Sequence, residues 1–388
     1  MRIAFIVRDA GVLGGTIKAT LNTATALADR GHEVTIASCV RSRPSPMFRP
    51  DPRITVVDLW DLRKPDKGGE SLSPLDRWRA RRPSILDERN ANRLNSSSAL
   101  FDRRVARYLR DADADVMIGT HLSVNLYLAR YGRDDVVKIA QEHTSFGQHR
   151  APLQDWVKTY FPRLDAVVTA TEADAEAYRG ALPGFRGPIA AIPNPVPPLD
   201  LDRDAEPGPV VMAAGRLVPA KGFSTLVRAF SRTVDRFPEW RLRIYGRGKE
   251  AKALEQLVED TRSEGRTRIM EPVVPLDQEW ADAAIAAIPS HHESFSLVMG
   301  EAMRAGVPVV ASAVPHGPVE VIEDGVNGLL VPKKDVAALT EALELLMGDP
   351  GLRAKLADGG RETARRFTPE KVAARCEELF EGLLAART

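Results

Sequence analysis

Residues 2–37 read RIAFIVRDAGVLGGTIKATLNTATALADRGHEVTIA, and this stretch decides the fold class. An apolar run over 2–7 predicts a short buried strand, which ends in a glycine-containing loop over 8–15. A helical pattern follows from Ile17 to Arg30, and residues 34–37 resume as a strand. Strand, glycine loop, helix and strand in this order open a parallel α/β layer.

Length, charge and cysteine content exclude several classes of protein. A chain of 388 residues is longer than one hydrophobic core usually serves, so two domains are expected. The net charge of +1 argues against a dedicated nucleic-acid binder. Cys39 and Cys376 lie far apart without His or Cys neighbours, so neither a disulfide framework nor a metal knuckle is indicated. Because the opening residues are too short for a secretory signal and no run of about 20 apolar residues occurs, we expect a cytoplasmic protein that is soluble or lies on a membrane surface.

A proline-rich, acidic stretch over 195–208 interrupts all periodicity and predicts a domain boundary. We expect an N-terminal Rossmann-like domain over 1–195 and a C-terminal one over 205–368, because the strand and helix alternation starts again after the boundary. Further strands are predicted in the first domain at 116–118, 136–140 and 166–170, and in the second at 210–214, 241–245, 284–288 and 307–311, with a helix over 222–237.

The first loop that carries chemistry contains Gly14 and Gly15, directly before the first helix. Backbone amides and the helix dipole can bind an anion there, although a tight turn would explain the glycines equally well. The loop is not the dinucleotide fingerprint, because the G-x-G-x-x-G spacing is missing and no acidic residue closes the second strand.

A second loop follows the strand that opens the second domain and holds Gly215, Arg216 and Lys221. Arg and Lys five residues apart, next to a helix start, would place two cations around a diphosphate. Two solvated surface cations are the alternative interpretation. The position at a strand end favours ligand binding, because open parallel sheets bind ligands at the carboxyl ends of their strands.

A third stretch runs from His291 to Glu301 and combines two carboxylates with a helix start at Ser296. Glu293 is predicted on the loop, where it would suit a sugar hydroxyl. Glu301 lies about two turns along the helix, where it would suit ribose hydroxyls. A solvated glutamate with a helix cap would explain either residue alone, but explains both together less well.

These motifs together resemble the large family of retaining glycosyltransferases with the GT-B architecture, which includes bacterial α-mannosyl and α-glucosyl transferases. The resemblance rests on the Glu293 to Glu301 spacing, on Gly215-Arg216 with Lys221-Gly222, and on Gly306 to Ala311, and the stretch from Glu320 to Pro332 matches the family's next block. It implies two Rossmann-like domains facing across a cleft, the acceptor on the first and the donor on the second. It also implies that the helix over 369–388 crosses back to the first domain.

The resemblance implies roles for individual residues in the second domain. Arg216 and Lys221 would stabilise the departing diphosphate, Glu293 would hold the donor sugar, and Glu301 would hold the ribose. Main-chain groups would contact the donor at Gly14, Gly15, Gly215, Ser296, Leu297 and Val298.

His143 is the candidate catalytic residue of the first domain. It ends a predicted strand in Gln141-Glu142-His143-Thr144 and matches the family's active-site histidine beside the transferred sugar. By itself, a histidine at a strand end is more often a hydrogen-bonded structural residue. The sequence departs from the family pattern at Ser296, where glycine is usual.

The implied reaction moves a hexosyl unit from a UDP- or GDP-sugar, with retention, to an acceptor such as a surface polymer, a lipid or a secondary metabolite. An Asp-x-Asp pattern lies over 111–115, but it stands at the amino end of a predicted strand, so we expect no metal and no cofactor besides the donor. The alternatives are a nucleotide-sugar epimerase of the same architecture and a non-catalytic nucleotide-sugar binding subunit.

Between Asp76 and Arg110 the chain carries ten arginines against four acidic residues, with Trp78 among them. Such a segment is most often a solvated helix face. A basic amphipathic segment can also dock an anionic membrane or a phosphate-bearing acceptor, either an anionic polymer or a lipid-linked one.

Overall fold

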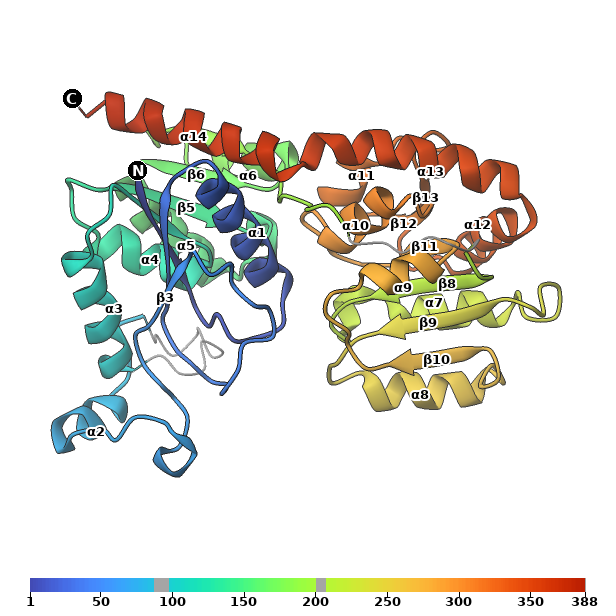
Figure 1. Ribbon diagram of the computed structural model, residues 1–388, viewed down its shortest axis with the longest axis horizontal. Helices are drawn as coiled ribbons and strands as arrows, with labels where there is room; N and C mark the ends of the chain where they lie inside the picture. The colour runs from blue at the N-terminus through green and yellow to red at the C-terminus, as the bar shows by residue number, and fades with distance from the viewer. Residues whose placement is uncertain (87–97, 200–206, 388) are drawn as a thin grey trace. The chain divides into compact units, whose positions relative to one another are not determined.

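The computed structural model describes residues 1–86, 98–199 and 207–387, and it divides into two compact units. Unit 1 comprises Met1–Pro195 together with Pro369–Thr388, and unit 2 comprises Val196–Thr368. Each unit contains one parallel β-sheet, and the colours of Figure 1 follow the chain through both. Within the described residues, no helix combines the length and the apolar character that a membrane span requires.

Unit 1 is built on a seven-stranded sheet in the order β3-β2-β1-β4-β5-β6-β7. The strands are β1 (Arg2–Val7), β2 (Glu33–Ser38), β3 (Thr55–Asp58), β4 (Val116–Gly119), β5 (Val137–Glu142), β6 (Ala166–Thr169) and β7 (Ile189–Ala191). The strand order reverses between β1 and β4, and in such sheets the crevice at the reversal is where ligands bind.

Helices cover both faces of this sheet because successive side chains of a strand point to opposite sides. Ile3, Phe5 and Val7 of β1 pack with α1 and α14, whereas Ala4 and Ile6 pack with α3 and α4. The α-helices of unit 1 are α1 (Gly15–Asp29), α2 (Pro74–Ala80), α3 (Ala99–Asp111), α4 (Leu122–Tyr131), α5 (Ala151–Tyr160), α6 (Glu172–Ala181) and α14 (Pro369–Ala385), and the short 3-10 turns are η1 (Pro65–Lys67), η2 (Phe146–Gln148) and η3 (Phe161–Arg163).

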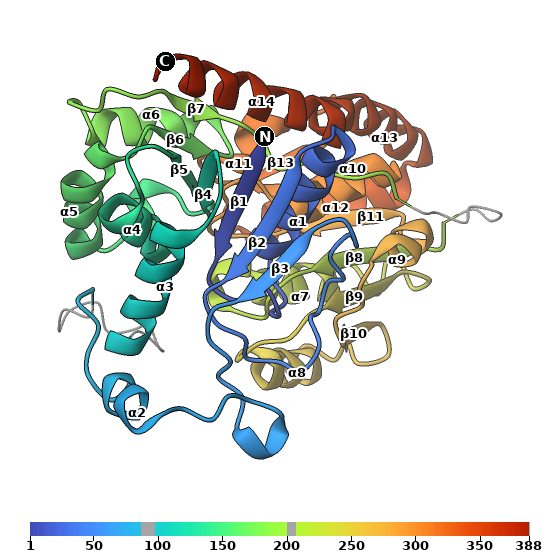
Figure 2. The ribbon, with the colours of Figure 1, turned by 60° about the vertical axis from the view of Figure 1, so that its left-hand side comes forward.

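The C-terminal helix α14 belongs to unit 1 and lies along α1 in both views (Figures 1 and 2). Its Glu377 carboxylate accepts a hydrogen bond from Arg30 Nε at 2.5 Å and lies 2.7 Å from His32 Nε2. Val372 and Phe380 of α14 are buried in the same core as β1 and α1. The helix therefore completes one face of the first sheet.

Unit 2 contains a six-stranded parallel sheet in the order β10-β9-β8-β11-β12-β13. Its strands are β8 (Val210–Ala214), β9 (Arg241–Tyr245), β10 (Thr267–Met270), β11 (Ile285–Ile288), β12 (Val309–Ala313) and β13 (Leu329–Pro332). Its helices are α7 (Phe223–Ser231), α8 (Ala251–Asp260), α9 (Asp277–Asp282), α10 (Leu297–Ala305), α11 (Gly317–Val321), α12 (Val336–Gly348) and α13 (Pro350–Ala364), with 3-10 turns η4 (Pro219–Lys221) and η5 (Arg365–Phe367). The strand order reverses between β8 and β11, so the predicted α/β class with two Rossmann-like sheets is confirmed.

One predicted helix is shorter than expected. The pattern predicts a helix over 222–237, but α7 ends at Ser231. The hydroxyl of Thr233 donates to the carbonyl of Phe230 at 2.8 Å, which offers the backbone a turn in place of the next helical bond. Pro238 follows and cannot continue a helix.

Candidate active site

In unit 2, Lys221 and Glu293 form a direct ion pair although 72 residues separate them. Lys221 Nζ lies 2.5 Å from Glu293 Oε2, and Ser290 Oγ donates to the same oxygen at 3.0 Å. Lys221 ends η4 after β8, and Glu293 lies on the loop after β11. The pair thus sits at the carboxyl ends of the two strands between which the strand order reverses.

Gly222 allows the loop after β8 and the loop after β11 to approach each other closely. Its φ is +66°, which disfavours other residues, and a Cβ at this position would stand 1.9 Å from the carbonyl oxygen of Pro289 and 3.0 Å from His291 Nε2. The loops are also joined by a backbone hydrogen bond of 2.8 Å from His291 to Ala220. A side chain at position 222 would separate Lys221 from Glu293.

The remaining predicted residues of unit 2 differ in position and in exposure. Gly215 lies next to Lys221, because a Cβ on Gly215 would be 3.7 Å from Lys221 Cε. Arg216 is exposed, whereas Glu301 is only 3% exposed within α10. Ser296 caps the start of α10, so its neighbours Leu297 and Val298 open that helix as predicted.

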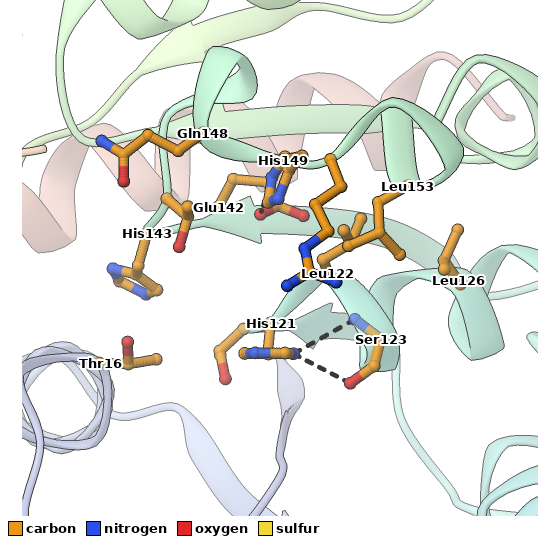
Figure 3. A pocket seen from close by; sticks show the side chains of 13 residues that line it. Thr16, His121, Leu122, Ser123, Leu126, Glu142, His143, Gln148, His149 and Leu153 are labelled. Carbon is orange, nitrogen blue, oxygen red and sulfur yellow. Dashed lines mark hydrogen bonds and ion pairs between the residues drawn. The ribbon is translucent and has the colours of Figure 1, made fainter. Parts of the chain in front are cut away.

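Unit 1 contains a cavity of about 310 Å³ at the carboxyl ends of its strands (Figure 3). It lies where the strand order reverses, because Thr16 follows β1, His121 follows β4 and His143 follows β5. The full lining is Thr16, Thr120, His121, Leu122, Ser123, Leu126, Glu142, His143, Thr144, Gln148, His149, Arg150 and Leu153. In this cavity His143 lies beside two further imidazoles and one carboxyl group.

Burial keeps the titratable groups of the cavity neutral. It lowers the pKa of His143, of His121 and of His149 to about 4 each, with smaller contributions from His121 on His143 and from Arg8 and His149 on His121. Burial also raises the pKa of Glu142 to about 8, although hydrogen bonds from Asn125 and Tyr178 oppose this change. Near pH 7 the three imidazoles and the Glu142 carboxyl therefore offer uncharged hydrogen-bonding groups, and Arg150 is the one cation among the described lining residues.

Two imidazoles of the cavity have definable hydrogen-bonding roles. His121 Nδ1 accepts from the backbone amide of Ser123 at 3.2 Å, so the neutral ring carries its proton on Nε2. His143 Nε2 is buried and has no hydrogen-bond partner among residues 1–86, 98–199 and 207–387. An unpaired buried polar atom costs free energy unless a ligand satisfies it.

Comparison with known proteins assigns the family. A model described as Glycosyltransferase Family 4 matches residues 13–198, and one described as Glycosyl transferases group 1 matches residues 208–349. The chain belongs to the GT-B glycosyltransferases.

Two curated relatives of this glycosyltransferase chain carry names for different activities. It is 32% identical over 392 residues to an exopolysaccharide phosphotransferase of Streptomyces coelicolor, a match that covers 100% of the chain but only 41% of that relative. It is 33% identical over 238 residues to a D-inositol 3-phosphate glycosyltransferase of Xylanimonas cellulosilytica, covering 60% of the chain and 55% of the relative. The match thus covers about half the length, or less, of each of these two curated relatives.

A solved structure shares the GT-B fold. A mutant of TarM from S. aureus aligns with a TM-score of 0.79 at 15% identity, covering 98% of this glycosyltransferase chain and 100% of that one.

The structure groups the predicted residues within each unit. It brings Lys221, Glu293 and Gly215 together in unit 2, and it places His143 in the cavity of unit 1. Gly14 and Gly15 lie at the start of α1, and a Cβ on either would meet no atom within 4 Å. The expected convergence of residues from the two units around one donor stays a prediction.

Three residues of the glycosyltransferase site were not singled out from the sequence. His121 and His149 line the cavity with His143. His291 lies against Gly222, and its buried Nε2 has no hydrogen-bond partner among the described residues. His121 could have been found, because it follows a strand end just as His143 does. His149 could not have been found, because it lies at the end of a 3-10 turn that no hydrophobic periodicity in the sequence predicts.

We expect Ser296 to tolerate glycine but not valine. Ser296 adopts φ +69°, which is unfavourable for a residue with a side chain, and its hydroxyl caps α10 by a long bond of 3.4 Å from Met299 N. Ser296→Gly should change the free energy of unfolding by less than about 0.5 kcal/mol, because backbone relief offsets a weak cap. Ser296→Val loses the cap and adds strain, so a loss of about 2 kcal/mol is expected in urea denaturation. Equal losses in both variants would contradict this explanation.

The three cavity imidazoles should make the fold acid-sensitive. The folded chain keeps them neutral down to about pH 4, whereas an unfolded chain protonates them near the ordinary imidazole pKa of about 6.5. The unfolded state therefore binds more protons between pH 6.5 and pH 4. The free energy of unfolding should fall as the pH falls through this window, and each histidine contributes at most about 1.4 kcal/mol per pH unit. Glu142 acts in the opposite sense, because its carboxyl stays protonated in the folded chain up to about pH 8.

Urea midpoints at several pH values between 4 and 6.5 measure this dependence. His121→Gln combined with His149→Gln should reduce the slope of unfolding free energy against pH, and Glu142→Gln should make it steeper. An unchanged slope in the double variant would show that these imidazoles titrate normally in the folded chain.

Proposed function

We propose that the chain transfers a hexosyl unit from a UDP- or GDP-sugar to an acceptor hydroxyl, with retention of configuration. The observation that carries the proposal is the Lys221–Glu293 pair at the strand reversal of unit 2. The match to the glycosyltransferase family supports the proposal, and so does the UDP bound in the TarM structure, which shares the fold.

The pair suits the charges that develop in such a transfer. The bond between the sugar C1 and the phosphate oxygen breaks, positive charge grows on the sugar, and the nucleoside diphosphate leaves with negative charge. Lys221 and the exposed Arg216 would stabilise the leaving diphosphate, and Glu293 would lie on the sugar side. The acceptor oxygen forms the new bond to C1, and its proton passes to the departing diphosphate oxygen.

The uncharged imidazoles in the cavity of unit 1 can exchange hydrogen bonds with hydroxyl groups of the sugar and of the acceptor. His143 Nε2 would gain its missing hydrogen bond from a sugar hydroxyl, and His121 Nε2–H would donate one. Surface polymers, lipids and secondary metabolites all present such hydroxyls, so the acceptor class stays open.

We propose that the reaction needs no divalent metal. Arg216 and Lys221 supply the positive charge that a metal would otherwise bring to the diphosphate. The Asp-x-Asp stretch lies before β4, at the amino end of the strand, and Asp115 is paired with Arg2 at 2.6 Å. Added chelator should therefore leave turnover unchanged, and activity that returns only with magnesium would refute metal independence.

The decisive experiment follows donor turnover with a doubly labelled substrate. UDP- and GDP-hexoses are first screened for a raised melting temperature, since a ligand that binds only the folded chain stabilises it. The stabilising donor, labelled in the sugar and in its β-phosphate, is then offered with and without acceptors. Glycosyl transfer sends only the sugar label to the product and gives the anomeric configuration of the donor.

The other outcomes identify the alternatives. Both labels in the product would indicate sugar-phosphate transfer, the activity that the name of the Streptomyces relative suggests. A changed donor sugar without acceptor would indicate an epimerase, and donor binding without any turnover would indicate a binding subunit.

A further inference from the structure

Residues 73–86 form a segment that we call the α2 arm, and it exposes large apolar side chains. Leu75 and Trp78 are each 53% exposed, and Ile85 is 48% exposed. Leu75 and Trp78 are three residues apart on α2, so they share one face of the helix. Both views show α2 standing away from the sheet of unit 1 (Figures 1 and 2). Three such side chains on one short segment indicate a contact surface.

The α2 arm is also strongly basic. It carries four arginines against one acidic residue, whereas the whole chain has a net charge of only +1. Asp76 pairs with Arg79 at 3.2 Å. In the described part of the chain, no carboxylate pairs with Arg77, Arg81 or Arg82. The guanidinium of Arg82 instead lies 4.7 Å from the centre of the Trp78 ring.

A buried polar cluster fixes the end of the arm to the core. Asp102 of α3 accepts hydrogen bonds from Ser84 Oγ at 2.6 Å and from the amide of Ile85 at 2.8 Å. Tyr127 of α4 contacts Ser84 Oγ at 2.8 Å and also donates to Asp102. Leu86 is only 2% exposed. The fold thus anchors the arm while leaving the apolar face of α2 uncovered.

We propose that the α2 arm docks unit 1 on an anionic lipid bilayer. Leu75 and Trp78 would enter the interface between headgroups and acyl chains, where indole rings are favoured, and the exposed Arg77 and Arg81 would lie on lipid phosphates. A fluid bilayer adapts to the protein surface, so docking on it does not require the shape complementarity of a protein interface. A surface as small as one seven-residue helix can therefore dock there. Stacking on nucleic-acid bases fits less well, because Arg82 already covers one face of Trp78.

This docking is independent of the proposed transfer reaction, although it would bring unit 1 to lipid-linked acceptors. It also gives a structural form to the membrane contact predicted for residues 76–110, of which residues 87–97 lie outside the described residues.

Sedimentation of the full chain with vesicles tests the proposal. Vesicles that contain 30% phosphatidylglycerol in phosphatidylcholine should bind the chain, and pure phosphatidylcholine should bind it at least about tenfold more weakly. Leu75→Ser with Trp78→Ser, and separately Arg77→Gln with Arg81→Gln, should each weaken binding to the anionic vesicles by about tenfold or more. All these side chains are exposed, so the melting temperature should not change.

Matched variants in unit 2 serve as controls. Arg228→Gln with Arg232→Gln removes two exposed arginines at the same spacing, and Leu345→Ser removes an apolar side chain that is 50% exposed. Neither should alter vesicle binding. Equal loss in arm and control variants, or no binding to anionic vesicles, would overturn the proposal. So would binding of duplex DNA that depends on the arm while vesicles are not bound.

Discussion

Replacing Lys221 by alanine is expected to lower the rate of sugar transfer by at least about 100-fold, the loss typical of removing one group that stabilises developing charge. The ammonium group is held 2.5 Å from Glu293, at the reversal point of the second sheet. Its removal leaves the departing diphosphate without this cation and the carboxylate without its partner. Turnover numbers with the donor that stabilises the chain, compared for wild type and Lys221→Ala, measure the effect.

The controls separate a catalytic loss from a folding defect. Lys252→Ala removes an exposed lysine from α8 of the same unit and should leave turnover unchanged. Glu293→Gln should also lower turnover, and the double variant should lose less than the product of the single losses, because residues that act as a unit are not additive. Normal turnover of Lys221→Ala in a folded protein would remove the basis of the proposed function.

Replacing His143 by alanine should also cost at least about 100-fold in turnover, within the range that a single positioned proton-transfer or hydrogen-bonding group contributes. Its melting temperature should stay the same or rise. The reason is that Nε2 is buried without a partner in the described structure, so the fold loses no hydrogen bond when the ring is removed. Activity assays and thermal unfolding on the same preparations test both halves of this expectation.

His143→Gln provides the conservative comparison, because its amide can place a hydrogen-bonding nitrogen near the position of Nε2. We expect it to recover part of the activity that alanine loses. If His143→Ala lowered the melting temperature as strongly as an ordinary core substitution, the imidazole would be a structural residue. The same conclusion would follow from wild-type turnover.

The sequence predicts most of the strands that support the site, because a buried parallel strand is a short apolar run between turn residues. β1, β4, β8 and β11 all appear in this way. β3 is not predicted, because its four residues are exposed and include only two apolar ones, Val56 and Val57, which are too few to mark a buried strand. The end of α7 is not predicted for a different reason. The Thr233 hydroxyl donates to the carbonyl of Phe230, which competes with the next helical hydrogen bond, and hydrophobic periodicity does not reveal this competition.

The sequence predicts which residues of the candidate site lie at strand ends, but it does not predict the contacts between them. The strand-end rule and the family resemblance single out Lys221, Glu293 and His143, but neither shows that Lys221 and Glu293 touch. That contact depends on Gly222, whose missing side chain lets two loops meet across 72 residues of sequence. The neutrality of the three cavity imidazoles is equally invisible in the sequence, because it comes from burial.

The place of α14 in unit 1 has a consequence for the order in which the protein folds during synthesis. Val372, Ala373 and Phe380 fill the core that β1 and α1 begin, yet they are translated after every residue of unit 2. The nascent first unit therefore keeps an unfilled apolar groove while the second unit is being made. Chaperones that bind exposed apolar surface would meet this chain at its N-terminal half, and only the last helix would release them.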